Sequence, residues 1–304
     1  MADRFDAGRI PRHVAARFRD PMPERMAAFD RYLCDMGRES ERATVLGRLA
    51  RDRRQIIPWL SRTRDLRGAR IIEIGCGLGA STVALAEQGA DLLAIDVAGE
   101  DVEAARKLTK AHDVGAKFVV ANAAEIDEIV QPGDANWIIF WAVLEHMTIR
   151  ERLQSLSRAW QTLSPGGLLT VVETPNRLWH FDSHTSLLPF FDWLPDELAF
   201  EYSRYSPRAS FCSAFRQRSE EDMLRFLRRG RGMSFHELEL AIAPVQDLDI
   251  ASAYQLERRA RNPARRLGWA LSRAGRYEAM LRKTASTVPR ALLQPFHYFT
   301  ARKG

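Results

Sequence analysis

A glycine-rich segment, Gly75-Cys76-Gly77-Leu78-Gly79, carries the strongest chemical signal in the sequence. It follows a short apolar run, and glycines at this spacing let the backbone approach a ligand closely where a strand ends. Asp96 lies about 20 residues further on, where an acid could bind the hydroxyls of a ribose. Taken alone, the pattern fits a dinucleotide such as NAD or a flavin, and also other cofactors that contain adenosine.

Three histidines are candidates for proton transfer, because a neutral imidazole accepts a proton near pH 7. His146 follows the apolar run 137–144, and we predict that it is a general base at the rim of a cleft. The alternative is a histidine that caps a helix or packs against a cofactor. His180 and His184 flank Asp182, where they could act as a base, contact a substrate, bind a metal or form structural hydrogen bonds.

The elements that would position these residues alternate between short apolar runs and helical stretches. Such alternation predicts right-handed β-α-β units and a doubly wound α/β sheet. We predict strands at 70–74, 91–96, 117–121, 137–143 and 168–173. The predicted helices are 80–88, 99–113, 123–130 and 149–163. Two later runs, 234–242 and 296–303, are predicted as a closing pair of strands.

Apolar spacing and composition divide the chain further. Residues 1–67 have apolar residues three and four apart and are predicted to be a helical extension. The remainder, 68–304, is predicted as the main domain. Within it, 174–232 is a long irregular insert on the substrate side, and 250–290 is a basic helical segment before the last strand.

With these elements in order, residues 68–176 resemble the class I S-adenosylmethionine (SAM)-dependent methyltransferases of the type 11/23-like family. The motifs that carry the resemblance are IIEIGCGLGAST, AIDVAG, WAVLEHM and LSPGGLLTVVETPN. Glu73 decides against a dinucleotide, because a carboxylate there opposes a diphosphate but suits a cationic sulfonium cofactor. The resemblance implies a Rossmann-like, seven-stranded, mostly parallel sheet whose last strand is antiparallel, with a helical N-terminal extension and a helical insert before that strand.

The resemblance also implies roles for individual residues in binding SAM. The glycines would pass under the methionine part, Asp96 would hold the ribose hydroxyls, and Asn122 would contact the adenine where the family usually has aspartate. Ubiquinone-type relatives associate a Glu-x-x-Glu-His segment with a divalent metal, but Ala142 stands at its first position here, so no metal is expected. The expected cofactor contacts are Glu73, Gly75, Cys76, Gly77, Gly79, Asp96, Val97, Asn122, Ala123 and Trp141.

The expected reaction is methyl transfer from SAM to a hydroxyl group of a sugar or glycolipid. This expectation rests on His146 and on aromatic residues of the insert that could stack on a sugar ring or seal the cleft, namely Trp179, Phe181, Phe190, Phe191 and Trp193. One alternative is a quinone or secondary-metabolite N-, O- or C-methyltransferase. Alternatives from other classes are a non-catalytic SAM-binding protein and an NAD-binding dehydrogenase.

Charge and cysteine content suggest where such a protein works. The last 54 residues hold 12 Lys and Arg against 2 acids, so residues 258–290 are either a helical segment with solvated arginines or a peripheral contact with an acidic membrane. No nucleic-acid-binding module is evident, which argues against a nucleic-acid acceptor. The sequence shows no secretory leader or transmembrane run, and three unpaired-looking cysteines predict a cytoplasmic protein. The oligomeric state is left open.

Overall fold

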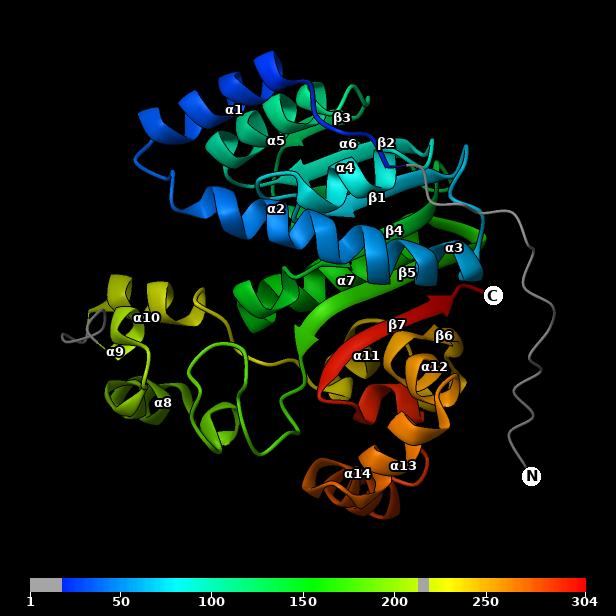
Figure 1. Cartoon of the computed structure of the whole chain (residues 1–304). Coiled ribbons are helices and arrows are strands. Elements are labelled where there is room, and N and C mark those ends of the chain that lie inside the picture. The colour runs from blue at the N-terminus through cyan, green and yellow to red at the C-terminus, as the bar shows by residue number, and fades with distance from the viewer. Residues whose placement is uncertain (1–17, 213–218) are drawn as a thin grey trace.

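A seven-stranded sheet lies at the centre of the computed structural model, which describes residues 18–212 and 219–304 (Figure 1). The strand order is β3-β2-β1-β4-β5-β7-β6. The part of the predicted N-terminal extension before residue 18 lies outside the described residues. The strands are β1 Arg70–Ile74, β2 Asp91–Asp96, β3 Lys117–Val120, β4 Ala135–Trp141, β5 Leu163–Pro175, β6 Asp249–Ala253 and β7 Phe296–Arg302.

Strands β1 to β5 pair in parallel, whereas β7 runs antiparallel to both β5 and β6. In the register, Ile72 of β1 lies beside Leu93 of β2 on one side and Ile138 of β4 on the other. The prediction of a Rossmann-like sheet with an antiparallel last strand is confirmed. Because the first five strands are parallel, their carboxyl ends meet at one edge of the sheet.

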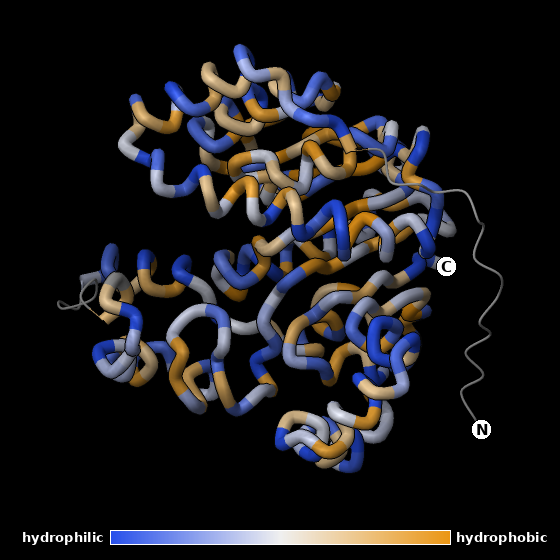
Figure 2. The backbone as a smooth tube through the Cα atoms, viewed as in Figure 1, coloured by the Kyte–Doolittle hydropathy of each residue, from blue (hydrophilic) through white to orange (hydrophobic). Residues whose placement is uncertain are grey.

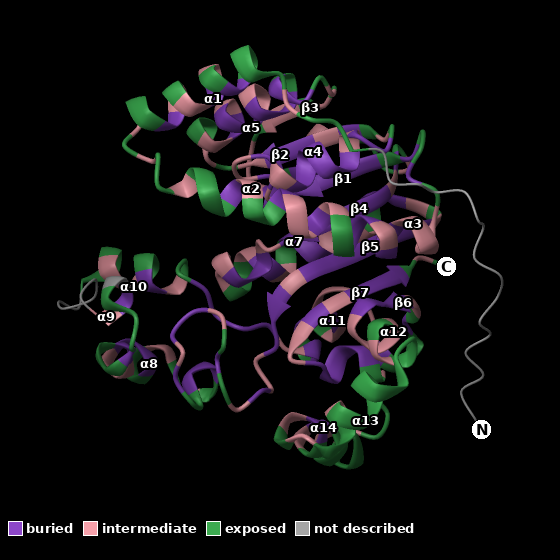
Figure 3. Cartoon of the chain, viewed as in Figure 1, coloured by how far each residue is buried: buried purple, intermediate pink, exposed green. Residues whose placement is uncertain are grey.

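Helices cover both faces of the sheet. Because each strand is apolar on both faces, its side chains pack alternately against the helices of one layer and of the other. Ile71, Trp137 and Ile139 pack into one core with α4 and α5. Their neighbours Ile72 and Ile138 pack into a second core with α6 and α7. Figures 2 and 3 show the strands as largely hydrophobic and buried. The helices are α4 Ala80–Ala86, α5 Gly99–Ala111, α6 Ile126–Ile129 and α7 Ile149–Thr162.

The N-terminal helices belong to the first of these cores. Phe29 of α1, Leu33 of the same helix and Trp59 of α3 are fully buried there. The Trp59 indole N–H donates a hydrogen bond of 2.7 Å to the Ser252 hydroxyl on β6, which ties the extension to the far edge of the sheet. The elements are α1 Pro23–Asp35, α2 Glu41–Arg51, a π-helical turn Asp52–Ile56 and α3 Ile57–Thr63.

The prediction of a strand at 234–242 is wrong, because this segment forms helix α11, Phe235–Ala241. Ser234 and Glu237 form a reciprocal capping box that starts the helix, and Phe235 and Leu238, three residues apart, are buried on one face. The alternation of apolar and polar residues that suggested a strand leaves Leu240 exposed to solvent. The sixth strand is instead the short edge strand β6.

The insert is irregular over 176–190 and then contains three short helices, whereas the basic segment is largely helical. Helices α8 Asp196–Tyr202, α9 Ala209–Cys212 and α10 Glu220–Leu227 surround a small aromatic core of their own, which includes Phe191, Phe200 and Phe226. The basic segment contains α12 Tyr254–Ala260, α13 Pro263–Leu271 and α14 Arg273–Thr284, as predicted. Short 3-10 turns lie at η2 Ala123–Glu125, η3 Leu144–His146, η4 Phe191–Trp193, η5 Ser203–Tyr205, η6 Val245–Asp247 and η7 Arg290–Leu293. Among the described residues, every helix is too short or too polar to cross a bilayer.

Candidate active site

A cavity of about 670 Å³ opens at the carboxyl ends of β1, β2 and β4. Its size lies within the range of about 300–1,000 Å³ that is usual for pockets that bind small molecules. The cavity sits where the chain reverses the strand order, since β1 has β2 on one side and β4 on the other. Open α/β sheets bind their ligands at such a switch point.

The glycine turn after β1 forms the floor of this cavity. Gly75 has a φ of +82° and Gly79 a φ of +90°, values that L side chains rarely adopt. A Cβ at Gly75 would lie 2.5 Å from the Val143 Cβ, and one at Gly79 would lie 2.7 Å from the Ala105 Cα. Gly77 also has positive φ but faces open space. Glycine is therefore required at positions 75 and 79 by the close packing of Val143 and Ala105, and at position 77 it leaves the backbone bare toward the cavity.

Asp96 closes this turn from the end of β2. One carboxylate oxygen accepts a hydrogen bond of 2.9 Å from the Gly77 amide, and the other accepts one of 3.0 Å from the Ala98 amide. Burial raises the pKa of Asp96, and the backbone amides partly offset that effect. Asn122, on the next strand end, holds its side-chain oxygen 3.0 Å from the Ala124 amide. Both polar side chains are thus fixed in the cavity wall.

Most of the predicted cofactor residues line this cavity: Gly75, Cys76, Gly77, Asp96, Val97, Asn122, Ala123 and Trp141. Glu73 and Gly79 are not part of its lining. Glu73 is fully buried behind the turn, where one carboxylate oxygen accepts a hydrogen bond of 2.6 Å from the Thr82 hydroxyl. Burial raises the pKa of Glu73 to about 7. The structure therefore places Glu73 beneath the cavity floor.

Because of Glu73, the protein is expected to lose stability as the pH rises from about 5 to 8. An unfolded chain releases the Glu73 proton near its ordinary pKa of 4.5, whereas the folded protein keeps it up to about pH 7. The folded state binds more protons in this window, so the free energy of unfolding falls by about 3 kcal/mol as the pH passes through it. Thermal unfolding at several pH values measures this fall.

Glu73→Gln is the control for that measurement, because glutamine keeps the shape and does not titrate. Asp52, whose pKa burial raises to about 6, acts in the same direction and stays in the variant. We therefore expect the Glu73→Gln variant to keep part of the decline in melting temperature, not all of it. A decline equal to that of the unmodified chain would contradict the role given to Glu73.

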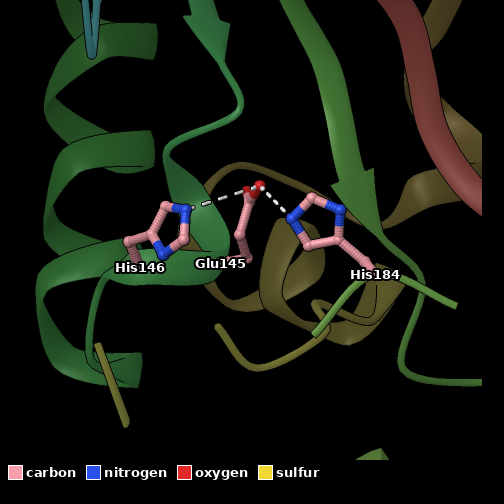
Figure 4. Close-up of side chains that lie close together, drawn as sticks. All are labelled: Glu145, His146 and His184. Carbon is pink, nitrogen blue, oxygen red and sulfur yellow. Dashed lines mark ion pairs between the residues drawn. The ribbon is translucent and has the colours of Figure 1, made fainter. Parts of the chain in front are cut away.

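A buried carboxylate with two imidazoles lies beside the cavity (Figure 4). Glu145, in the turn after β4, is fully buried, and its Oε2 accepts a hydrogen bond of 3.2 Å from the Thr174 hydroxyl. Its Oε1 has no hydrogen-bond partner among the described residues. The Nε2 atoms of His146 and His184 lie 4.0 and 3.7 Å from that oxygen. We call these three residues the Glu145 cluster.

The orientation of His146 is set by the insert. Its Nδ1 lies 2.9 Å from the Arg228 carbonyl oxygen, and a carbonyl only accepts, so Nδ1 carries the proton. Nε2 of the neutral ring therefore has a free lone pair, and it points toward Glu145 (Figure 4). His146 lines the main cavity and is partly open to it. The ring therefore offers an unprotonated Nε2 beside a buried carboxylate, at a residue that lines the cavity.

His184 reaches the cluster because Asp182 folds the chain back on itself. The buried Asp182 carboxylate accepts hydrogen bonds from the amides of His184 and Thr185, both at 2.9 Å, and from the amide and hydroxyl of Ser186. This turn holds the His184 backbone rigidly. His184 of the insert thus lies beside the turn that follows β4.

The Glu145 cluster also has the composition of a cation site. Its three ligand atoms lie within 4.8 Å of one another, and a carboxylate with two imidazoles suits a divalent cation such as Zn²⁺. The unpartnered Glu145 Oε1 fits this arrangement, as does the bond from His146 Nδ1 to a carbonyl. The Glu-x-x-Glu-His segment of ubiquinone-type relatives has a glutamate where this chain has Ala142. His184 supplies a third ligand atom in place of that missing carboxylate.

His180, the other candidate base of the insert, does not join the Glu145 cluster. Its ring packs edge-on against Tyr277, with centroids 4.7 Å apart, and beside Trp179. It lines a separate cavity near α13 and α14. The turn at Asp182 sends His180 and His184 in different directions. The aromatic residues singled out in the insert, Trp179, Phe181, Phe190, Phe191 and Trp193, are also absent from the main cavity wall.

The wall opposite the cofactor residues is charged instead. Arg51 makes two hydrogen bonds to the Glu173 carboxylate, at 2.5 and 2.6 Å, and Arg228 bonds to Glu151 at 2.6 Å. All four side chains line the cavity. Sequence reasoning missed them, and it missed Glu145. Only the position of Glu145 directly after a buried strand, next to His146, could have indicated it.

Comparison with known proteins agrees with this geometry. Residues 71–167 match a family model described as "Methyltransferase domain". A ubiquinone biosynthesis O-methyltransferase from Xanthomonas campestris pv. campestris (strain B100) is 33% identical over 112 residues, which are 37% of this chain and 45% of that protein. A magnesium-protoporphyrin O-methyltransferase from Rhodobacter capsulatus is 36% identical over 70 residues, 23% of this chain and 25% of that protein.

The matched segment spans less than half the length of these relatives. A crystal structure of magnesium protoporphyrin IX methyltransferase from Synechocystis PCC 6803 with bound SAH aligns with a TM-score of 0.35 and 21% identity, over 40% of this chain and 54% of that one. The family match covers the glycine turn, Asp96, Asn122 and the Glu145 turn. Residues 71–167 of this chain are therefore similar to a methyltransferase domain.

Proposed function

We propose that the protein transfers a methyl group from SAM to a hydroxyl oxygen of its acceptor, with His146 as the general base. One observation carries the proposal. The Nδ1 contact with the Arg228 carbonyl leaves the His146 Nε2 unprotonated beside Glu145, and His146 lines the cavity that also holds the glycine turn and Asp96. A proton acceptor thus stands where an acceptor hydroxyl would meet the cofactor.

In this proposal the cofactor lies along the strand ends. The two hydroxyls of the ribose donate to the Asp96 carboxylate, which is suited to accept two hydrogen bonds. The methionine part crosses the bare backbone at Gly75 and Gly77, and the adenine lies between Val97 and Asn122. Eight of the ten residues predicted from the sequence support this placement by lining the cavity.

Methyl transfer is a displacement at carbon. The hydroxyl oxygen of the acceptor attacks the methyl carbon, the carbon–sulfur bond breaks, and its electron pair stays on sulfur to give S-adenosylhomocysteine. The hydroxyl proton passes to His146 Nε2, and the buried Glu145 carboxylate stabilises the imidazolium that forms. If the Glu145 cluster holds a divalent cation, that cation would polarise the hydroxyl in place of the imidazole.

We propose a sugar or glycolipid as the acceptor, on the character of the cavity wall. The side that faces His146 is lined by Arg48, Arg51, Glu151 and Arg228, and Trp141 is the one Phe, Tyr or Trp residue in the lining of described residues. A hydroxyl-rich acceptor can hydrogen-bond to such a wall, whereas a flat aromatic acceptor would find one aromatic side chain to stack on. The two relatives described above are instead named for ubiquinone biosynthesis and for magnesium-protoporphyrin.

We also propose that α13 brings the protein to an acidic membrane surface. None of its residues is buried, and Leu267 and Leu271 lie four positions apart with 62% and 71% of their surface exposed. Arg265, Arg266 and Arg273 lie beside them in the sequence. Apolar side chains among arginines on one helix are typical of interfacial binding.

Methyl-labelled SAM tests these proposals when it is incubated with the protein and an extract separated into glycan, lipid and small-molecule fractions. We expect label in glycan or lipid products, and sedimentation of the protein with vesicles that contain phosphatidylglycerol. The double variant Leu267→Glu/Leu271→Glu should lose vesicle binding, while Leu240→Glu, at another exposed leucine, should keep it. Label confined to aromatic small molecules would contradict the sugar acceptor, and no label in any fraction would contradict methyl transfer.

A further inference from the structure

A second, smaller cavity of about 320 Å³ lies beside the Glu145 cluster. Three arginines from different parts of the chain line it: Arg48 from α2, Arg208 just before α9 and Arg229 just after α10. Ser183 and Thr185 add hydroxyl groups, and none of the described lining residues is acidic. We call this cavity the basic side pocket.

The basic side pocket is built by the same segments that position the proposed base. Gly230 has a φ of +128°, and a Cβ there would lie 2.6 Å from the Thr185 hydroxyl oxygen. Glycine therefore lets the chain that carries Arg229 lie directly against the turn that Asp182 holds. Arg228 directly precedes Arg229, and its carbonyl oxygen fixes the orientation of the His146 ring. The pocket and the reaction site thus share a wall.

Two residues join the basic side pocket to the reaction site. Arg48 lines both this pocket and the main cavity. His184 lines the pocket and places its Nε2 3.7 Å from Glu145 Oε1. A molecule whose hydroxyl lies at His146 would therefore extend past Glu145 into a space surrounded by three guanidinium groups.

We propose that the basic side pocket binds a phosphoryl group of the methyl acceptor. Guanidinium groups match phosphate oxygens in charge and in planar, two-point geometry. Three arginines beside two side chains with hydroxyl groups gather more positive charge than a carboxylate, with its single charge, balances. A phosphoryl group has three or more oxygens and carries up to two charges. The acceptor is thus a hydroxyl compound that bears a phosphate or diphosphate near the methylated oxygen.

This inference deepens the proposed function and rests on it, but its test needs no methyl transfer. The test is binding of inorganic phosphate and of pyrophosphate to the full chain with S-adenosylhomocysteine present. Titration calorimetry at fixed ionic strength reports the affinity, because salt screens exposed charges. The variant is Arg208→Gln/Arg229→Gln, and the matched control is Arg31→Gln/Arg54→Gln, which removes two exposed arginines that line neither cavity.

We expect the variant to bind both anions at least tenfold more weakly than the unmodified protein, while the control binds them unchanged. Affinity for S-adenosylhomocysteine should be the same in all three proteins, which also shows that the variant is folded. Tighter binding of pyrophosphate than of phosphate indicates a diphosphate-linked acceptor, and similar binding indicates a monophosphate. Equal anion affinity in the variant and the unmodified protein, or equal losses in variant and control, would overturn the inference.

The two proposals fail separately. If the phosphate site is real and methyl transfer is not, the anions bind through Arg208 and Arg229 but no extract fraction takes up label. If methyl transfer is real and the phosphate site is not, label appears in products without phosphate and the double variant transfers methyl groups at the normal rate.

Discussion

Asp96→Ala is expected to lower the affinity for S-adenosylhomocysteine by at least a hundredfold and to abolish methyl transfer. The variant loses two proposed hydrogen bonds from the ribose to a charged carboxylate, each of which contributes about 1.5–3 kcal/mol. It also releases the amides of Gly77 and Ala98, which Asp96 holds in place. Titration calorimetry with S-adenosylhomocysteine measures the affinity.

Two further variants make this result specific. Asp96→Asn keeps the shape and one acceptor oxygen, so we expect an intermediate affinity. Asp91→Ala removes an exposed acid from the opposite end of the same strand and should bind like the unmodified protein. Unchanged affinity in Asp96→Ala would mean that the cofactor does not lie along β2, and the proposed placement would have to be abandoned.

His146→Ala is expected to reduce kcat by a factor of about 10²–10⁴, the usual contribution of a positioned general base. Binding of S-adenosylhomocysteine should remain, because no cofactor contact is proposed for this side chain. Initial rates at saturating SAM, with the acceptor fraction identified above, provide the measurement.

The matched control is His236→Ala, an exposed histidine on α11 far from the cavity lining, which should keep full activity. Glu145→Gln should reduce kcat as well, and the double variant with His146→Ala should lose little more, because the two residues act as one unit. An unchanged rate in His146→Ala would refute the base. If EDTA abolishes the activity of the unmodified protein, a metal ion and not the His146 imidazole activates the acceptor hydroxyl.

The strands that hold the cofactor cavity are predictable because their burial leaves a direct mark on the sequence. β1, β2 and β4 are buried on both faces, so they appear as continuous apolar runs next to glycine or acidic residues. The edge strand β6 carries no such run, since it is short and partly exposed. The apolar residues of 234–242 alternate, a pattern that also fits a strand. The capping box of Ser234 and Glu237 starts a helix there instead.

The Glu145 cluster could be predicted only in part. His146 is found from its place after β4, but the approach of His184 depends on contacts between segments far apart in the sequence. The turn at Asp182 sets its direction, and Arg231 anchors the insert through its amide to the Glu145 carbonyl, 2.8 Å away. Nothing local in the sequence distinguishes His184, which reaches Glu145, from His180, which does not.

The bond between Trp59 and Ser252 has a consequence for how the chain folds. Trp59 and Ser252 lie 193 residues apart in the sequence, so the Trp59 indole N–H cannot reach its partner until β6 has been synthesised. Contacts at such sequence separation slow folding. The docking of α3 against the edge of the sheet is therefore expected to be a late step of folding.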